Sequence, residues 1–144
     1  MYEVKLFDGL KKGYIQYIGK DVSNLGGHVI RIFKDHFDAD ERIDLSQLYC
    51  SSDYFYAQTF VNPGVDAGLW QKQSVIPLED DFKLPWFKHT PDIDHNSSFR
   101  WSIYKLYERP IFVGILFWKL KKLADSDIRN PFSIISILEE SIDD

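Results

Sequence analysis

The sequence predicts an α+β fold in which a mainly antiparallel β sheet curls into a small barrel or half-barrel, with a C-terminal helix packed on it. Three observations support this fold class. Short segments rich in Tyr, Ile, Val and Phe alternate with turn residues along most of the chain, which is typical of antiparallel sheets. The one long helical pattern with capping residues lies near the C-terminus. The 144 residues, 44% of them hydrophobic, are enough for a single domain spanning 1–144.

The N-terminal part is expected to form three strands. Residues 2–7 (YEVKLF), 13–18 (GYIQYI) and 28–33 (HVIRIF) contain the β-branched and aromatic side chains that favour strands. Asp8-Gly9 provides a turn after the first segment. Gly26-Gly27 precedes the third, where a bulge or a close backbone approach is expected.

The middle of the chain mixes short helical turns with strands. Residues 44–49 predict one helical turn, which begins at an aspartate cap. Residues 54–61 predict a strand that ends at residues 62–64 (NPG), because proline cannot donate to a β ladder. Residues 65–70 are expected to add another short turn of helix, and residues 73–78 a fifth strand.

The C-terminal part predicts a long loop, two strands and a helix. Residues 79–98 contain two prolines and no sustained periodicity, and therefore indicate a loop. Residues 99–107 alternate clearly, and residues 110–118 (PIFVGILFW) are so apolar that they predict the most buried strand. Asn130 suits the N-cap, and Pro131 the first turn, of a helix with one apolar face.

The aromatic residues divide into an expected core and an expected surface. Bulky side chains must fill a small barrel, and those assigned to the interior are Tyr14, Phe33, Phe60, Trp70, Trp101 and Phe112. Those assigned to exposed contacts are Tyr54, Trp86 and Phe87. Trp86-Phe87 lies in the long acidic loop and is the best candidate for an aromatic anchor in a partner.

Composition and charge disfavour several classes of protein. Cys50 is the only cysteine, so no intrachain disulfide forms, and a reducing compartment is expected. The first residues lack the pattern of a secretory signal, and the apolar run at 110–120 is about half the length of a membrane-spanning helix. A net charge of −5 disfavours nucleic-acid binding. We therefore expect a cytoplasmic protein that contacts neither membrane nor nucleic acid.

The histidines form no recognised metal motif, since HxH and HExxH spacings do not occur in the sequence. His89, Asp92, Asp94 and His95 place four potential ligands within seven residues and leave a loop metal site open, although loops collect such residues anyway. A calcium-loop pattern begins at Asp92 but fails, because Ser97 takes the place of the required glycine.

The sequence also contains no catalytic or cofactor signature. The GxSxG, Walker and dinucleotide-binding motifs do not occur. Cys50 and His36 offer a thiol and a base, but a lone cysteine without a local motif is more often a small buried hydrophobe. We therefore expect no enzyme activity, no cofactor and no resident metal.

Acidic residues are concentrated after the third predicted strand and again in the long loop. Acidic surfaces attract basic partners and accelerate their association. The first predicted contact set is Asp35, Asp38, Asp40, Glu41 and Asp44. The second is Glu79, Asp80, Asp81 and Trp86. A solvated face without a partner is the alternative interpretation.

Four segments together carry a family resemblance. They are GYIQYIG at 13–19, LGGHVIRIFK at 25–34, FYAQT at 55–59 and GLW at 68–70. They resemble the immunity protein 26 family, whose members are bacterial proteins associated with polymorphic-toxin and contact-dependent inhibition loci. The resemblance covers residues 13–118, with Gln58 at a position where the family commonly has histidine. Some members carry a phosphotriesterase label, but no catalytic residue of that activity maps onto this sequence.

The resemblance implies an immunity protein, a cytoplasmic and non-catalytic inhibitor that binds a cognate toxin C-terminal domain. Binding would occlude the active site or substrate groove of the toxin. The acidic sets fit a nuclease toxin, whose substrate groove is positive. A small metal-dependent phosphoester hydrolase is the alternative, and an interaction module with an unrelated ligand is a third hypothesis.

Overall fold

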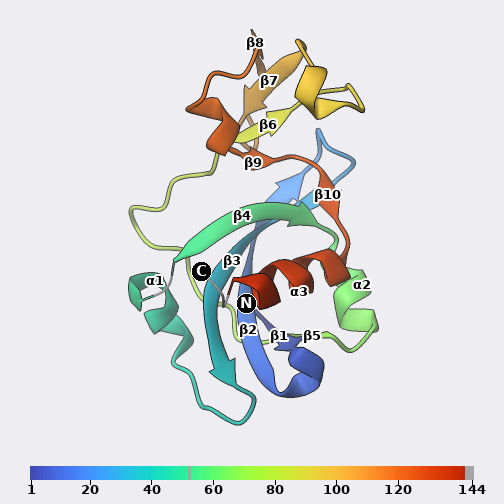
Figure 1. The fold of residues 1–144 in the computed structure, drawn as a ribbon. Helices are drawn as coiled ribbons and strands as arrows, with labels where there is room; N and C mark the ends of the chain where they lie inside the picture. The colour runs from blue at the N-terminus through green and yellow to red at the C-terminus, as the bar shows by residue number, and fades with distance from the viewer. Residues whose placement is uncertain (52, 142–144) are drawn as a thin grey trace.

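The computed structural model describes residues 1–51 and 53–141, and these form two β sheets (Figure 1). The larger sheet has six strands in the order β10-β4-β3-β2-β1-β5. Its neighbouring strands run antiparallel except β10 and β4, which are parallel. The strands are β1 (Tyr2–Leu6), β2 (Lys11–Asp21), β3 (Gly27–Asp38), β4 (Tyr54–Thr59), β5 (Trp70–Lys72) and β10 (Ile128–Arg129).

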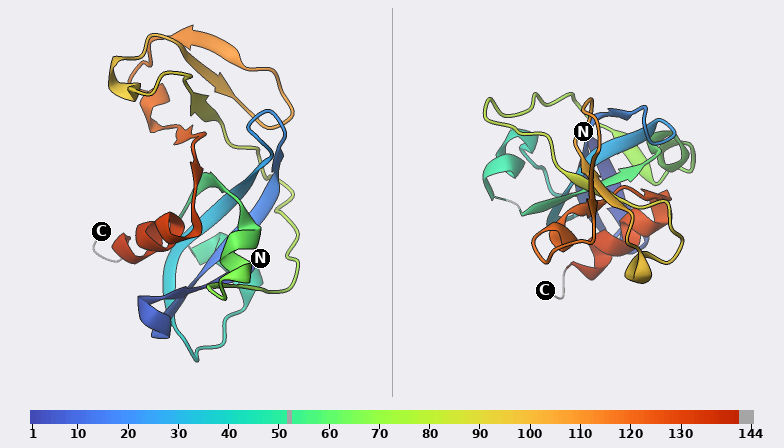
Figure 2. Two further views of the ribbon diagram at one scale, coloured as in Figure 1. Left: turned by 90° about the vertical axis from the view of Figure 1, so that its right-hand side faces the viewer. Right: turned by 90° about the horizontal axis from the view of Figure 1, so that it is seen from above.

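The smaller sheet has the order β8-β7-β6-β9 and forms a lobe at one end of the larger sheet (Figure 1, Figure 2). Its strands pair antiparallel except β6 and β9, which are parallel. The chain enters the lobe through the long segment after β5 and leaves it through β9, which leads into β10. The strands are β6 (Phe87–His89), β7 (Trp101–Tyr104), β8 (Ile111–Gly114) and β9 (Ala124–Asp125).

Short helices connect and cover these strands. The α-helices in the described residues are α1 (Leu48–Ser51), α2 (Val61–Asp66) and α3 (Pro131–Glu140). The 3-10 turns are η1 (Phe7–Gly9), η2 (Leu45–Gln47), η3 (His95–Ser97) and η4 (Leu120–Lys122). In the part of the chain that the structure describes, no helix has the length and apolar character needed to cross a membrane.

The predicted fold class is confirmed, because the six-stranded sheet curls into a half-barrel and the C-terminal helix α3 packs on it (Figure 2). The predicted start of this helix is also confirmed. The Asn130 side chain accepts a hydrogen bond of 2.8 Å from the Ser133 N–H, and Pro131 occupies the first turn. Ile134 and Leu138 on its apolar face are fully buried against the sheet.

Strand β3 is buried on both faces, and this arrangement shapes the interior. Ile30 and Ile32 belong to the core that α3 covers. Arg31 and Phe33 point to the opposite face, because successive side chains of a strand alternate. On that face lie α1 and the segment 73–82. The strand continues to Asp38, beyond its predicted end at residue 33, so part of the predicted acidic connection is strand.

The two sheets share a small apolar core at their junction. Phe87, Tyr104 and Leu106 from the smaller lobe pack against Val29 of β3. Beside this core, the Asn24 side chain donates a hydrogen bond of 2.6 Å to the Ser126 carbonyl. The small lobe is therefore packed on the β2–β3 end of the larger sheet.

Two predictions for the middle of the chain are wrong. Residues 73–78 form no strand; they cross β2, where the Ile76 carbonyl accepts a hydrogen bond from the buried Gln16. The helical turn expected at 65–70 begins earlier, since α2 includes the NPG residues predicted to end a strand. Pro63 is tolerated there because the first N–H groups of a helix have no intrahelical acceptor.

Two predictions for the C-terminal part are also wrong. Residues 79–98, expected to be a loop, contain β6 and η3. The 110–118 segment, expected to be the most buried strand, is largely exposed because β8 is the edge strand of the small sheet. Its hydrophobic content reflects a surface, not a core.

The predicted distribution of aromatic residues is partly confirmed. Tyr14, Phe33, Trp70 and Trp101 are buried, and Tyr54 is exposed, as expected. Phe60 and Phe112, assigned to the core, are exposed. Phe87, assigned to the surface, is fully buried at the junction of the sheets. The Cys50 side chain, weighed as a nucleophile, lies outside the part that the structure describes.

Candidate functional site

The first predicted acidic set lies along one stretch of chain at the end of β3 and in the connection to η2. Asp38 pairs with Lys11, whose pKa is raised by the hydrogen bond between them (2.6 Å). The Glu41 side chain accepts from the Asp38 N–H, and Asp44 caps η2 by accepting from the Ser46 N–H at 3.1 Å. Asp40 and Glu41 are exposed on the turn, so they present charge to solvent.

The second predicted set is divided by the structure. Asp80 and Asp81 are exposed, but the Glu79 carboxylate binds the buried Arg31 at 2.6 and 2.8 Å. Trp86 is half-buried, and its ring stacks under the Lys105 ammonium at 4.7 Å. Glu79 thus has an internal partner, whereas its two acidic neighbours remain on the surface.

Arg31 occupies an aromatic cage that the sequence did not reveal. Its guanidinium lies 4.9–5.5 Å from the ring centres of Phe33, Tyr49, Tyr54 and Phe82. It also donates to the Gln16 side chain at 2.9 Å. The Arg31 hydrogen bonds lower the pKa of Glu79. Because the guanidinium is fully buried, this cluster fastens the segment 73–82 to the sheet and offers no open site.

A second buried polar cluster lies where the two sheets meet. The Tyr104 hydroxyl donates to the Asp21 carboxylate at 2.7 Å, and the Gln58 amide donates to the same oxygen at 3.0 Å. Burial and the Asp21 charge raise the pKa of Tyr104. Gln58, at the position where the resembled family commonly has histidine, is fully buried in this cluster. The cluster therefore couples the two sheets through buried hydrogen bonds.

The four potential ligands of the predicted loop metal site do not converge. His89 contacts the Ser126 hydroxyl at 2.9 Å, and Asp92 forms an ion pair with Arg100. Asp94 caps η3 by accepting from the Asn96 N–H at 3.0 Å. The fourth, His95, faces two carboxylates from elsewhere in the chain.

The partners of His95 are Asp125 and Asp127. In the described residues, these three side chains are the group whose ligand atoms lie close enough to hold one metal ion, within 4.8 Å of one another. Sequence reasoning missed this group because Asp125, which ends β9, and Asp127, two residues later, are about 30 positions from His95. The parallel pairing of β9 with β6 brings them together.

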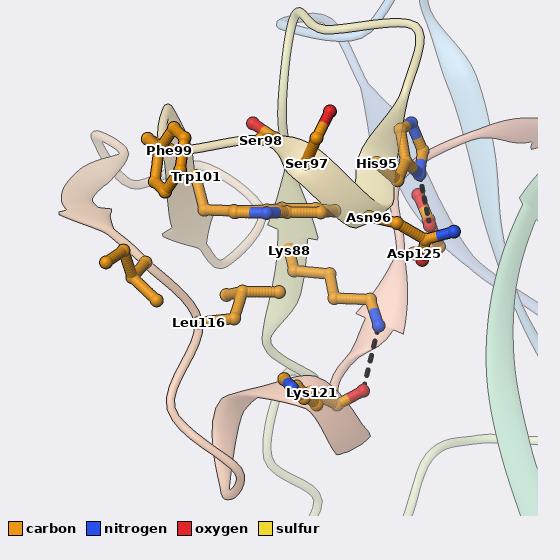
Figure 3. A pocket seen from close by; sticks show the side chains of 11 residues that line it. Lys88, His95, Asn96, Ser97, Ser98, Phe99, Trp101, Leu116, Lys121 and Asp125 are labelled. Carbon is orange, nitrogen blue, oxygen red and sulfur yellow. Dashed lines mark hydrogen bonds and ion pairs between the residues drawn. The ribbon is translucent and has the colours of Figure 1, made fainter.

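A cavity of about 370 Å³ opens beside this group, between the outer face of the small sheet, η3 and the segment 115–121 (Figure 3). Trp101 and Leu116 supply its apolar surface, and His95 and Asp125 lie at its edge. The Lys88 side chain extends across the cavity, and its ammonium donates a hydrogen bond of 2.8 Å to the Lys121 carbonyl. The cavity is therefore mixed in character, with an aromatic side and fixed charges.

The same lobe carries a group of exposed large hydrophobic side chains, here called the aromatic surface. Its side chains come from β8, from the segment that follows β8, and from Phe99. Its side chains are 60–71% exposed and are Phe99, Phe112, Ile115, Phe117 and Trp118. Lys119 and Lys122 approach the Trp118 ring at 5.4 and 5.8 Å.

Comparison with protein-family models, with curated proteins and with solved structures finds no match in any of the three.

Proposed function

We propose that this chain is a non-catalytic binding protein that neutralises a cognate toxin domain, as an immunity protein acting in the cytoplasm. The sequence resemblance motivates the choice of partner. The observation that supports binding is the aromatic surface, with five large hydrophobic side chains 60–71% exposed on one lobe. Soluble monomers seldom expose such groups together, and they mark protein-interaction sites. Aromatic anchors supply most of the binding energy in many interfaces.

The turn that contains Asp40 and Glu41, here called the acidic turn, supports the proposal that the toxin is a nuclease. Asp40 and Glu41 are exposed where the chain leaves β3, at the end of the molecule remote from the small lobe in Figure 1. A nuclease has a positive substrate groove, and an acidic loop attracts such a groove and accelerates encounter. In this proposal the aromatic surface provides most of the binding affinity, and the acidic turn raises the association rate and selects a basic partner.

The test of the aromatic surface is binding to the product of the gene immediately upstream, which this proposal expects to contain the cognate toxin domain. Trp118→Ala and Phe112→Ala are expected to raise Kd by about tenfold or more, since anchor side chains contribute over 1 kcal/mol each. Val75→Ala is a matched control, because Val75 is equally apolar and exposed but lies outside the small lobe. Wild-type affinity in both variants, or no complex with that domain, contradicts the proposal.

The role of the acidic turn is tested separately, by the rate at which the complex forms. Charge reversal by Asp40→Lys with Glu41→Lys is expected to slow association and to weaken its dependence on salt, with little change in dissociation. Asp66→Lys with Glu140→Lys, at exposed carboxylates on α2 and α3, is the control, because it changes the net charge by the same amount. An association rate that changes equally in both variants would contradict a role specific to the turn.

Metal-dependent phosphoester hydrolysis remains the second candidate function. One observation favours it, namely the His95, Asp125 and Asp127 group at the edge of a cavity that also contains Lys88. A bound ion there would activate water, and the lysine would attract a phosphate. Turnover of a phosphodiester by the purified protein with added Mn²⁺, abolished by Asp125→Asn, would support it. Turnover that survives Asp125→Asn would contradict it.

A further inference from the structure

We propose that His95, Asp125 and Asp127 form a binding site for a divalent transition-metal ion. The site is independent of the proposed toxin binding, because its residues are distinct from the aromatic surface and the acidic turn. It also does not require catalysis, since an ion that joins η3 to β9 has a structural role by itself. The proposal rests on the placement of the three side chains and on their separations.

Two backbone features place these ligands in advance. Asp94 caps η3 through the Asn96 N–H and the Ser97 hydroxyl, so His95 begins a fixed turn. The His95 ring is also held edge-on to Trp101, with ring centres 5.3 Å apart. On the other side, the Ser126 N–H donates to the Lys88 carbonyl and fixes the chain between the two aspartates. The donor set is thus held by the fold and not by flexible loops alone.

The separation between His95 and Asp125 matches that of two ligands of one ion and exceeds that of a hydrogen bond. His95 Nδ1 lies 3.5 Å from Asp125 Oδ2, and His95 Nε2 lies 3.8 Å from Asp127 Oδ2. A hydrogen bond between such groups spans about 2.7–3.2 Å. Two ligands bonded at about 2.0–2.2 Å to one ion lie roughly 3–3.5 Å apart. Because one ion binds only one imidazole nitrogen, Asp127, which lies next to Nε2, must rotate its side chain to share an ion held by Nδ1 and Asp125. The three side chains permit this, since their ligand atoms lie within 4.8 Å of one another.

The charges near the two carboxylates are also consistent with a bound cation. Within the described residues, His95 is the only basic group in ion-pair range of Asp125 or Asp127. Lys88 lies opposite Asp125 in the β6–β9 pairing, yet its ammonium is directed to the Lys121 carbonyl. The Asp127 N–H donates a hydrogen bond to Asp125 Oδ1, so Oδ2 is the oxygen that faces the His95 imidazole. A dication would offset the negative charges of the two carboxylates.

The donor types select the metal. One imidazole nitrogen and two carboxylate oxygens suit Zn²⁺, Mn²⁺ or Fe²⁺, whereas Mg²⁺ and Ca²⁺ prefer oxygen ligands only. The side chains are partly exposed, and the cavity of about 370 Å³ adjoins them. Three protein ligands leave coordination positions open to water or to a further group from this cavity.

The experiment is a calorimetric titration. The purified full chain is first stripped of metal with chelator and is then titrated with Zn²⁺ or Mn²⁺ alone. We expect one saturable site in the wild type. Asp125→Asn and His95→Gln should weaken it by more than about 100-fold, beyond the 10–100-fold typical of outer-shell changes. Glu108→Gln is the matched control, because it removes an exposed carboxylate of the same lobe that does not belong to the group.

Paramagnetic broadening by Mn²⁺ gives a second readout that needs no variant. Amide signals of residues 95, 125 and 127 should disappear first, at substoichiometric Mn²⁺. Broadening that begins instead at the acidic turn, or Zn²⁺ binding unchanged in Asp125→Asn, would overturn the site. Circular dichroism of each metal-free variant separates loss of the ligand from loss of the fold. The two proposals can fail separately. Loss of the metal site with toxin binding intact would overturn only the metal site, and loss of toxin binding with the metal site intact would overturn only the proposed function.

Discussion

Arg31 and Glu79 form a two-point ion pair, with the guanidinium nitrogens 2.6 and 2.8 Å from the two carboxylate oxygens. Arg31 lies in the middle of β3 with its side chain fully buried, whereas Glu79 belongs to the irregular segment before the small lobe. Burial of a charge is costly unless it is paired and hydrogen-bonded. The pair therefore fastens the connection between the lobes to the centre of the larger sheet.

Replacement of Glu79 by glutamine should destabilise the protein. The variant leaves the Arg31 charge buried without a counter-charge, and breaking a buried pair costs about 3–5 kcal/mol. We expect about 3 kcal/mol, because the Glu79 side chain is 24% exposed and water offsets part of the loss. Urea unfolding measures the change. Asp80→Asn, at an exposed neighbour, should change stability by less than about 0.5 kcal/mol. Equal stabilities for the two variants would show that the pair contributes nothing.

The same pair predicts a dependence of stability on acid. Hydrogen bonds from Arg31 hold the pKa of Glu79 below its ordinary value in the folded state. As the pH falls below about 4.3, the unfolded chain takes up a proton at this residue before the folded chain does. Stability contributed by Glu79 is therefore complete above that pH and is lost as the pH falls through the folded pKa. Urea midpoints between pH 6 and pH 3 should decline less in Glu79→Gln than in the wild type.

One group that remains in both proteins serves as an internal reference for this comparison. The Asp92 pKa is also lowered, by hydrogen bonds from Arg100 and Ser98. Its contribution to the acid response is the same in wild type and variant, so it cancels in the difference. A difference that stays constant across the pH range would contradict the assigned role of Glu79.

Tyr104 provides a test of the contact between the sheets. Tyr104→Phe removes the hydroxyl that donates to the buried Asp21 carboxylate at 2.7 Å and leaves that oxygen with the Gln58 amide. A hydrogen bond to a charged group contributes about 1.5–3 kcal/mol, and we expect a loss in that range. Tyr107→Phe removes the hydroxyl of a tyrosine of the same lobe that is 76% exposed, and should change the free energy of unfolding little. Chemical denaturation of both variants provides the measurement, and an unchanged Tyr104→Phe protein would refute the contribution.

Local signals predicted those parts of the fold that depend on neighbouring residues. The start of α3 follows from Asn130 and Pro131, which act on the turn they begin. The cap of η2 at Asp44 was predicted for the same reason, and it is confirmed by the hydrogen bond from Ser46. Strands β1 to β4 follow from their composition, because their β-branched and aromatic residues suit a sheet buried on both faces.

Features that depend on pairing between distant segments were not predictable in this way. The Arg31 cage needs Tyr49 and Phe82, which come from segments on either side of β4. The His95 group needs β9, which reaches it only through parallel pairing with β6. Hydrophobic content also could not show that β8 is an edge strand, since the strand order is set by contacts of the whole chain. Hydrophobic content alone therefore predicts a core position for the 110–118 segment, which is largely exposed.

Gly64 in α2 is required by the neighbouring Trp70. A Cβ atom at position 64 would lie 2.4–2.9 Å from three atoms of the Trp70 indole, far inside normal contact. The indole is buried in the main core and cannot swing away. Gly64→Ala gains about 1 kcal/mol of helix propensity but incurs overpacking of about 1–3 kcal/mol, and the rigid ring places it at the upper end. We expect a net loss of about 1–2 kcal/mol in thermal or urea unfolding.

A double-mutant cycle with Trp70→Phe separates this clash from any effect on the helix. The smaller ring of phenylalanine leaves room beside position 64, so Gly64→Ala in that background should cost less or should stabilise, through its helix propensity alone. Val65→Ala, at a partly exposed position of the same helix, controls for general sensitivity of α2. If Gly64→Ala has the same cost with tryptophan and with phenylalanine at position 70, the contact with the indole is not the reason that glycine occurs there.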